Sequence, residues 1–149
     1  ERRRRAPVQA PATKKGRVPE IAAAEAKRSQ LYLSLLQFFE TYDYLALPAV
    51  QVLPFPVEQE WVREIEGCPM DNYLQWMQAC CVFSLFPVPA LSVPGGFSRE
   101  GLPIGLQLVG RPAGDLELLQ LAHAFEQATR YFERVPRGIA SFEPARTRS

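Results

Sequence analysis

The segment Pro89–Arg111, PALSVPGGFSREGLPIGLQLVGR, constrains the fold of this chain most strongly. Continuous apolar residues at 90–93 and 104–109 predict two strands, each bounded by turn-forming residues. The polar segment Ser98–Gly101 predicts the turn that joins them. The Pro-Gly-Gly run at 94–96 is expected either to end the first strand or to introduce a bulge. The segment therefore predicts a β-hairpin.

Helical periodicity predicts three helices elsewhere in the chain. The first is expected at 20–40, and its second half, LYLSLLQFF, is apolar on nearly every side and is expected to be buried. The second is expected at 71–82 with Asp71 as its N-cap, and the third at 115–129 with Asp115 in its first turn. The expected apolar face of the third helix consists of Leu116, Leu118, Leu119, Leu121, Ala122 and Phe125.

A third strand is predicted at 44–48, where YLALP is apolar throughout and therefore expected to be buried on both faces. The prolines that follow predict an extended loop. The stretch 61–69 is polar and is expected to be irregular. Two prolines at 87 and 89 exclude a central strand between Phe83 and Pro89.

Charge is distributed unevenly along the 149 residues. Residues 1–17 contain seven Lys or Arg and one acidic residue, whereas the remainder carries a net charge of −5. A basic segment attracts nucleic acid or anionic surfaces weakly, but no aromatic residue lies between these charges to stack on bases. We therefore expect a disordered basic tail at 1–18, no specific nucleic-acid partner, and a polar tail at 136–149.

The composition is that of an ordinary globular domain, with 47% hydrophobic and 22% charged residues. No apolar run is long enough for a transmembrane helix, so no membrane partner is expected. The chain begins with Glu1 rather than Met, which favours a processed or partial chain. Cys68, Cys80 and Cys81 are odd in number and lack metal-ligand spacing, so we expect packed free thiols in a reducing compartment, the cytoplasm.

The order of sequence motifs carries a family resemblance. The chain contains, in order, FFETYDYLALP, a proline-rich loop, DNYLQWM, PALSVPGGF, GLPIGLQLVGR and LLQLAHAFEQAT. Over residues 19–135, this order resembles the C-terminal portion of the amidase signature family. The resemblance implies an α/β fold, the C-terminal part of a mixed sheet with helices on both faces. Segments 44–48, 90–94 and 104–109 would add strands to that sheet, and 115–129 would cover one face.

The resemblance also implies a chemistry, the hydrolysis of carbon–nitrogen amide bonds to a carboxylate and an amine or ammonia. The family uses a Ser–Ser–Lys triad and a glycine- and serine-rich loop whose N–H groups stabilise the oxyanion. It needs no cofactor and no metal. The implied partners are a small-molecule amide and either an N-terminal amidase portion or a second copy of the chain.

The residues that perform this chemistry have no match here. The chain has no GGSSGG-like run, and its only lysines are Lys14, Lys15 and Lys27. Ser92 and Ser98 have no base nearby in sequence, and Ser92 is interpreted as a core hydroxyl. We therefore assign no catalytic residue, and we expect the chain to be inactive alone. The alternative is a non-catalytic, truncated or partner-binding module derived from an amidase.

Other polar and aromatic residues fit structural roles. His123 is expected on a helix face, although a pairing with Cys80 or Cys81 as a nucleophile is conceivable. Four aromatic residues are interpreted as core or interface packing, with an apolar acyl pocket as the alternative: Trp61, Tyr73, Trp76 and Phe83. Three acidic residues are interpreted as solvated surface charge: Glu64, Glu66 and Asp71. Where the family commonly has Thr-Gly before PALSVP, this chain has Phe86-Pro87-Val88, so the backbone before the strand at 90–94 is expected to differ from that of the family.

Overall fold

The structure, a computed structural model, describes residues 18–134. The segments 1–17 and 136–149, for which tails are expected, therefore lie outside the described residues. Residue 18, expected to be the last of the tail, is instead the first residue of a helix.

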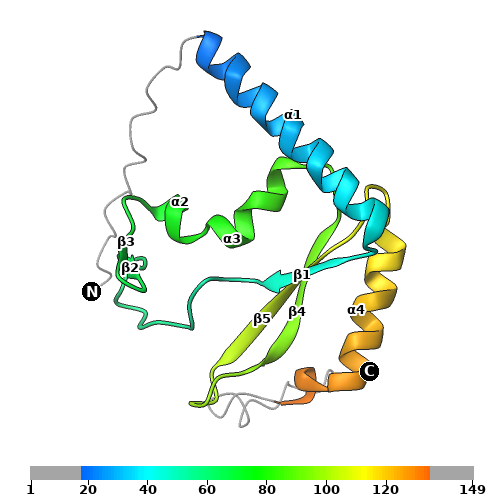
Figure 1. The fold of residues 1–149 in the computed structure, drawn as a ribbon. Coiled ribbons are helices and arrows are strands. Elements are labelled where there is room, and N and C mark those ends of the chain that lie inside the picture. Colours follow the sequence, from blue (N-terminus) through cyan, green and yellow to red (C-terminus); the bar gives the residue numbers. More distant parts are fainter. Residues whose placement is uncertain (1–17, 135–149) are drawn as a thin grey trace, which may run out of the picture.

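A three-stranded sheet occupies the centre of the described chain (Figure 1). It contains β1 (Leu45–Pro48), β4 (Ala90–Phe97) and β5 (Pro103–Val109) in the order β1-β5-β4. Both pairings are antiparallel, so the described strands include no parallel pair of the expected mixed sheet. The three strands predicted from the sequence are confirmed, and the α/β fold class with them. The expected burial of the strand at 44–48 on both faces is wrong, because half-buried and exposed residues alternate along β1 in the described chain.

The first strand of the hairpin continues past its predicted end. Pro94 pairs with Gly105, and Gly96 pairs with Ile104, so one extra residue of β4 lies between them. Of the two outcomes that the Pro-Gly-Gly run left open, the bulge is therefore correct. The predicted turn is also confirmed, because the Ser98 N–H donates to the Leu102 carbonyl at 2.8 Å.

The helix α4 (Asp115–Thr129) covers one face of the hairpin. Leu118 and Ala122 of α4 are buried against Val93 of β4 and Leu108 of β5. Residues four apart on a helix share one face, which explains why Leu118 and Ala122 point inward together. The expected burial of Leu116 and Leu119 is wrong: these side chains are 65% and 58% exposed, because they lie outside the face of α4 that packs on the sheet.

The first helix, α1 (Val18–Thr41), is longer than predicted and less buried. Only Phe39 is buried among its described side chains, while Leu31 and Leu33 are 55% and 59% exposed. The expectation that its second half is buried on all sides is therefore wrong for the described chain. Figure 1 shows the reason, since α1 extends away from the sheet and the described residues form no layer over its outer side.

The helix expected at 71–82 is divided into short pieces. It consists of α2 (Tyr73–Trp76), α3 (Gln78–Cys81) and a 3₁₀ turn at Val82–Leu85. The break lies at Met77, whose φ of −97° and ψ of 4° place it between helical and extended backbone.

The N-cap of α2 is Asn72, so the assignment of Asp71 is wrong. The Asn72 Oδ1 accepts hydrogen bonds from the N–H groups of Leu74 and Gln75 at 3.0 and 3.1 Å. Asp71 instead donates its backbone N–H to the Gln75 Oε1 at 2.7 Å. The side chains of Asn72 and Gln75 therefore fix the start of α2, and the Asp71 side chain has no part in the cap.

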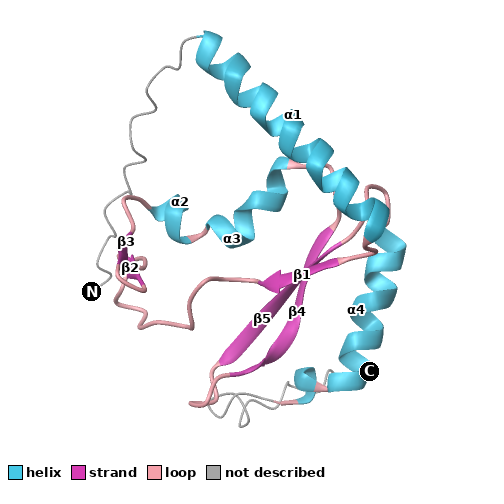
Figure 2. Cartoon of the chain, viewed as in Figure 1, coloured by secondary structure: helices cyan, strands magenta, loops and turns pink. Residues whose placement is uncertain are grey.

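The region at 61–69 is more regular than expected. Strands β2 (Glu64–Ile65) and β3 (Cys68–Pro69) form a small hairpin away from the main sheet (Figure 2). Its turn residues Glu66 and Gly67 have φ values of 49° and 80°. Two consecutive residues with positive φ form the turn that matches the twist of a tight hairpin.

The helices were also compared with the length and hydropathy that a membrane span requires. Within residues 18–134, none of them meets both requirements.

Burial of Leu118 is expected to be the largest single contribution of α4 to stability. Leu118 is 1% exposed and Leu119 is 58% exposed, so the two adjacent leucines form a matched pair. We predict that Leu118→Ala lowers the free energy of unfolding by about 2–5 kcal/mol, because it leaves a cavity in the core. Leu119→Ala should change it by less than about 0.5 kcal/mol. Urea unfolding followed by tryptophan fluorescence measures both, and equal losses would contradict the described packing of α4.

Candidate functional site

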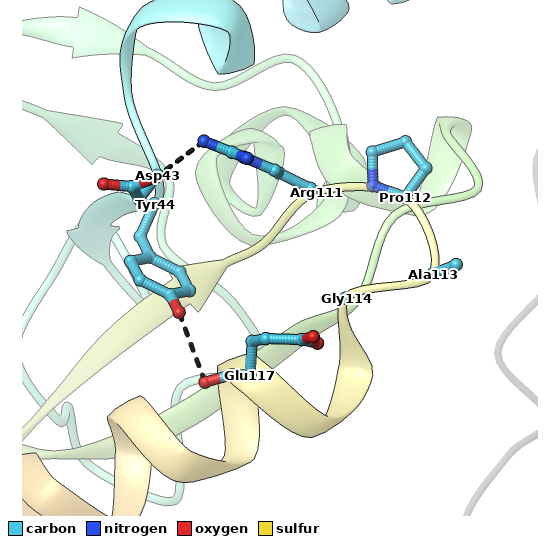
Figure 3. Close-up of a pocket in the computed structure, with 7 residues that line it drawn as sticks. All are labelled: Asp43, Tyr44, Arg111, Pro112, Ala113, Gly114 and Glu117. Atoms are coloured by element: carbon cyan, nitrogen blue, oxygen red, sulfur yellow. Dashed lines mark hydrogen bonds and ion pairs between the residues drawn. The ribbon is translucent and has the colours of Figure 1, made fainter.

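A cavity of about 300 Å³ lies where α1, β1, β5 and α4 meet (Figure 3). Its lining residues are Asp43, Tyr44, Arg111, Pro112, Ala113, Gly114 and Glu117. Arg111 Nη2 and Asp43 Oδ1 form an ion pair at 2.6 Å, and the Tyr44 hydroxyl donates to the Glu117 carbonyl at 3.4 Å. Asp43 and Tyr44 precede β1, Arg111 follows β5, and Glu117 lies in the first turn of α4.

The Asp43–Arg111 ion pair and the Tyr44–Glu117 hydrogen bond join the start of β1 to the end of β5 and to α4. Neither contact supplies a group that could react with a substrate. The side chains of Arg111 and Asp43 are 51% and 78% exposed, so water screens their attraction and the pair stabilises the fold by less than about 1 kcal/mol. None of the seven lining residues is a serine, cysteine, histidine or lysine. We therefore interpret the cavity as structural, because the contacts of its lining residues fix the ends of β1 and β5 relative to α4.

The two serines of the hairpin lie in different surroundings. The Ser98 hydroxyl accepts hydrogen bonds from the Glu100 and Leu102 N–H groups at 3.2 and 3.1 Å, so it stabilises the turn. Ser92 is exposed on β4, and its interpretation as a core hydroxyl is therefore wrong for the described chain. Strand alternation explains this difference, because Leu91 and Val93 face α4 and Ser92 points to the other side.

This opposite face of the sheet holds an unsatisfied polar group. Ser92 pairs across the strands with Gln107, whose Oε1 is buried and has no hydrogen-bond partner among the described residues. Gly105 lies on the same face, two residues before Gln107 on β5. Sequence reasoning missed Gln107, although a single polar residue within the apolar strand PIGLQLV is a signal that could have identified it.

The histidine and the cysteines do not form a catalytic pair. His123 is exposed on α4, and its side chain makes no hydrogen bond or ion pair with the described residues. Cys80 instead contacts its neighbour, with the two Sγ atoms 3.9 Å apart, and its thiol donates to the Met77 carbonyl at 3.0 Å. Burial raises the pKa of the Cys80 thiol, which opposes formation of a nucleophilic thiolate. Cys68 is exposed in β3.

The two tryptophans lie outside the main sheet and each contacts another side chain. Trp76 packs edge-on against Phe55 and Tyr73, with ring centroids 5.6 and 5.8 Å apart. The Trp76 Nε1 is buried without a hydrogen-bond partner among the described residues. Trp61 lies under the Arg63 guanidinium at 4.1 Å. These contacts agree with the packing interpretation of the two tryptophans, and Phe83 is half-buried.

Charged residues named from the sequence lie at the surface. Lys27 is exposed on α1, and Lys14 and Lys15 lie outside the described residues. Glu64, Glu66 and Asp71 are exposed, as expected for solvated charge. Within residues 18–134, no three His, Cys, Asp or Glu side chains are grouped closely enough to hold a metal ion.

A second, more open cavity of about 700 Å³ follows the short helices α2 and α3. It is lined by Asp71, Asn72, Leu74, Gln75, Gln78, Ala79, Cys81, Val82 and Leu85. Leu74 and Leu85 are 69% and 48% exposed, so apolar surface remains accessible along this groove. Its lining combines apolar side chains with the polar side chains of Asp71, Asn72, Gln75 and Gln78.

Comparison with known proteins identifies relatives of the chain. The amidase family model matches residues 1–119, which include the basic segment and end within α4. The chain is 43% identical over 104 residues to a glutamyl-tRNA(Gln) amidotransferase subunit of Moorella thermoacetica, covering 68% of this chain and 20% of that protein. It is 35% identical over 117 residues to the corresponding subunit of Brevibacillus brevis, covering 78% of this chain and 22% of that protein.

Similar solved structures also come from amidases. A crystal structure of an amidase superposes with a TM-score of 0.64 at 30% identity, covering 74% of this chain and 25% of that one. A bacterial aryl acylamidase of the amidase signature family gives a TM-score of 0.71 at 24% identity, which is a likeness of fold, covering 80% of this chain and 25% of that one. The chain spans about a fifth of the length of the curated relatives it matches.

The Ala49 and Ser92 side chains lie close to Gly105 on the face of the sheet opposite α4, and this packing can be tested. A Cβ at this position would lie 2.9 Å from the Ala49 Cβ and 3.2 Å from the Ser92 Oγ. We predict that Gly105→Ala lowers the free energy of unfolding by about 1–3 kcal/mol through overpacking. Adding Ala49→Gly should recover part of the loss, with a coupling energy of at least about 0.5 kcal/mol. Urea unfolding of both single variants and the double variant measures it, and additive losses would contradict the close contact.

Proposed function

The chain belongs to the amidase family, and we propose that it forms the C-terminal scaffold of an amidase domain that hydrolyses a carbon–nitrogen bond. The family match over residues 1–119 carries this proposal. The chain spans about a fifth of the matched relatives, and its only lysine among the described residues, Lys27, is exposed on α1. We therefore assign the nucleophile and its base to residues outside these 149.

The proposed reaction adds water across an amide bond and releases a carboxylate with an amine or ammonia. Such a reaction needs an activated hydroxyl, a group that transfers a proton, and donors that face the oxyanion. In our proposal this chain supplies none of these groups. It contributes β1, β4 and β5 as a rigid sheet held from one side by α4, and side chains for part of the wall of the substrate pocket.

The face that carries Ser92 and Gln107 is our candidate for contact with the rest of the domain. It points away from α4, and the buried Gln107 Oε1 lacks a donor among the described residues. Leaving a buried amide oxygen without a partner costs about 1–3 kcal/mol. A donor from the remaining part of an amidase would remove that cost.

We propose a small-molecule amide as the substrate and an N-terminal amidase portion as the first partner, with a second copy of the chain as the alternative. Exposed apolar side chains support the need for a partner, since Val18, Val57 and Leu74 are 79%, 88% and 69% exposed. Two matched relatives are each named as one subunit of a glutamyl-tRNA(Gln) amidotransferase. From these relatives we propose only that this chain associates with a partner. We do not propose that it acts on glutamyl-tRNA.

We also propose a cytoplasmic location. The three cysteines are free and Cys68 is exposed, which favours a compartment that keeps thiols reduced. Cell fractionation with immunoblotting against the chain should recover it with cytoplasmic markers, and recovery in a secreted fraction would contradict the proposal.

The activity proposal is tested with a panel of amides and a fluorophosphonate probe that labels nucleophilic serines. The isolated chain should give no turnover and no labelling, whereas the chain expressed in one polypeptide with an N-terminal amidase portion should give both. Specific labelling of the isolated chain, lost in Ser92→Ala or in Ser98→Ala, would refute the assignment of the nucleophile to outside residues.

The same samples separate the scaffold from the alternative, a non-catalytic partner-binding module. Light scattering after size-exclusion chromatography should show that the isolated chain associates, because its exposed apolar surface lacks cover. A monodisperse monomer that unfolds cooperatively, together with a joined polypeptide that stays inactive, would favour the module.

A further inference from the structure

Two neighbouring cysteines place a pair of thiols on one short helix. Cys80 and Cys81 are the last two residues of α3, and their Sγ atoms are 3.9 Å apart. Neighbouring residues on a regular helix diverge by about 100° around its axis and rarely meet. The break at Met77 and the 3₁₀ turn that follows make this segment irregular, and here the two sulfur atoms are in contact.

Cys81, one member of the pair, is accessible from a cavity. Both side chains are half-buried, and Cys81 lines the 700 Å³ cavity along α2 and α3. Leu74, Ala79 and Val82 give the same cavity apolar walls. A small ligand with an apolar group could therefore reach the thiols through the cavity and bury that group against these walls.

Neither a disulfide bond nor a structural zinc site fits the geometry of Cys80 and Cys81. Adjacent Cα atoms are about 3.8 Å apart, below the range of about 4.4–6.8 Å that disulfides normally span, so a bond between the two sulfurs would distort α3. Sulfurs bound to one tetrahedral zinc ion lie about 3.8 Å apart, which fits, but a structural zinc site needs four ligands. No third His, Cys, Asp or Glu is grouped with the pair in residues 18–134.

The remaining match is a thiophilic centre that needs only two sulfur ligands. We propose that Cys80 and Cys81 form a vicinal dithiol site that binds one monosubstituted trivalent arsenical. The step forms two As–S bonds, breaks two S–H bonds and the As–O bonding of the reagent, and releases the oxygen with both thiol protons as one water molecule. No electron is transferred, and the product carries no charge.

Protonation of the Cys80 thiol is compatible with this step. Burial first, and then the hydrogen bond with Cys81, raise the pKa of the Cys80 thiol. A protonated thiol is a poor nucleophile towards reagents that need a thiolate, such as iodoacetamide. The dithiol reaction instead removes both thiol protons in the released water and leaves no charge in the partly buried site.

Phenylarsine oxide tests the site in the full chain, with intact-mass spectrometry as the readout. We expect one adduct per chain, with the mass of the reagent less one water, that is stable to excess monothiol and is released by a dithiol. Cys80→Ser and Cys81→Ser should each weaken binding at least tenfold, or by about 1.4 kcal/mol. Cys68→Ser should bind as the parent chain does, because Cys68 lies in a different element, β3.

Circular dichroism of each variant separates loss of the site from loss of the fold. A variant that keeps the parent spectrum and loses the adduct supports the proposal. No adduct on the folded parent chain, an adduct that persists with equal affinity in Cys81→Ser, or an adduct lost only in Cys68→Ser would overturn it. The result is independent of amide hydrolysis, since the readout is binding by the isolated chain.

Discussion

The described fold depends on the pairing of β5 along both of its edges. Because β1 and β4 each bond to it, β5 fixes the position of two segments that lie far apart in the sequence. The approach is closest at Gly105, where the Ala49 and Ser92 side chains occupy the space that a Cβ would need. The Ala49 N–H extends this pairing beyond β1 by donating to the Gly105 carbonyl at 2.9 Å. A side chain at this one position would force the strands to shift.

The pairing of β4 with β5 also fixes which side chains lie on each face of the sheet. Alternation along β4 and β5 directs Val93 and Leu108 to one side, where Leu118 of α4 packs on them, and Ser92 and Gln107 to the other. The first face is closed within the described chain. The second carries an exposed hydroxyl and a buried amide oxygen without a donor among residues 18–134. The polar face is therefore the side of the sheet that we propose contacts the rest of the domain.

The sequence was informative where pattern and packing agree. The three strands and the position of α4 were predictable because apolar runs, turn residues and an acidic first turn all indicate the same elements. Adjacent leucines in α4 were not distinguishable, since the rotation that buries Leu118 and exposes Leu119 depends on where the sheet lies. Asn72 and Asp71 are both good N-caps, and only the actual backbone decides between them. A catalytic site could not be predicted, because the residue types that carry the family's chemistry are not present in the required pattern.

The balance between buried and exposed apolar surface explains why this chain is better understood as part of a larger domain. Its buried hydrophobic residues among those described are Phe39, Val62, Val93, Leu108, Val109, Leu118 and Ala122, a small core for a described chain of this length. Large apolar side chains on α1, along the groove of α2 and α3, and on the outer side of α4 stay exposed. Burying each such side chain is worth about 1.5–3 kcal/mol, so covering them would outweigh the marginal stability of a small domain. The described residues therefore bury a small core and leave a large apolar surface exposed, as expected for one region of a larger amidase-family protein.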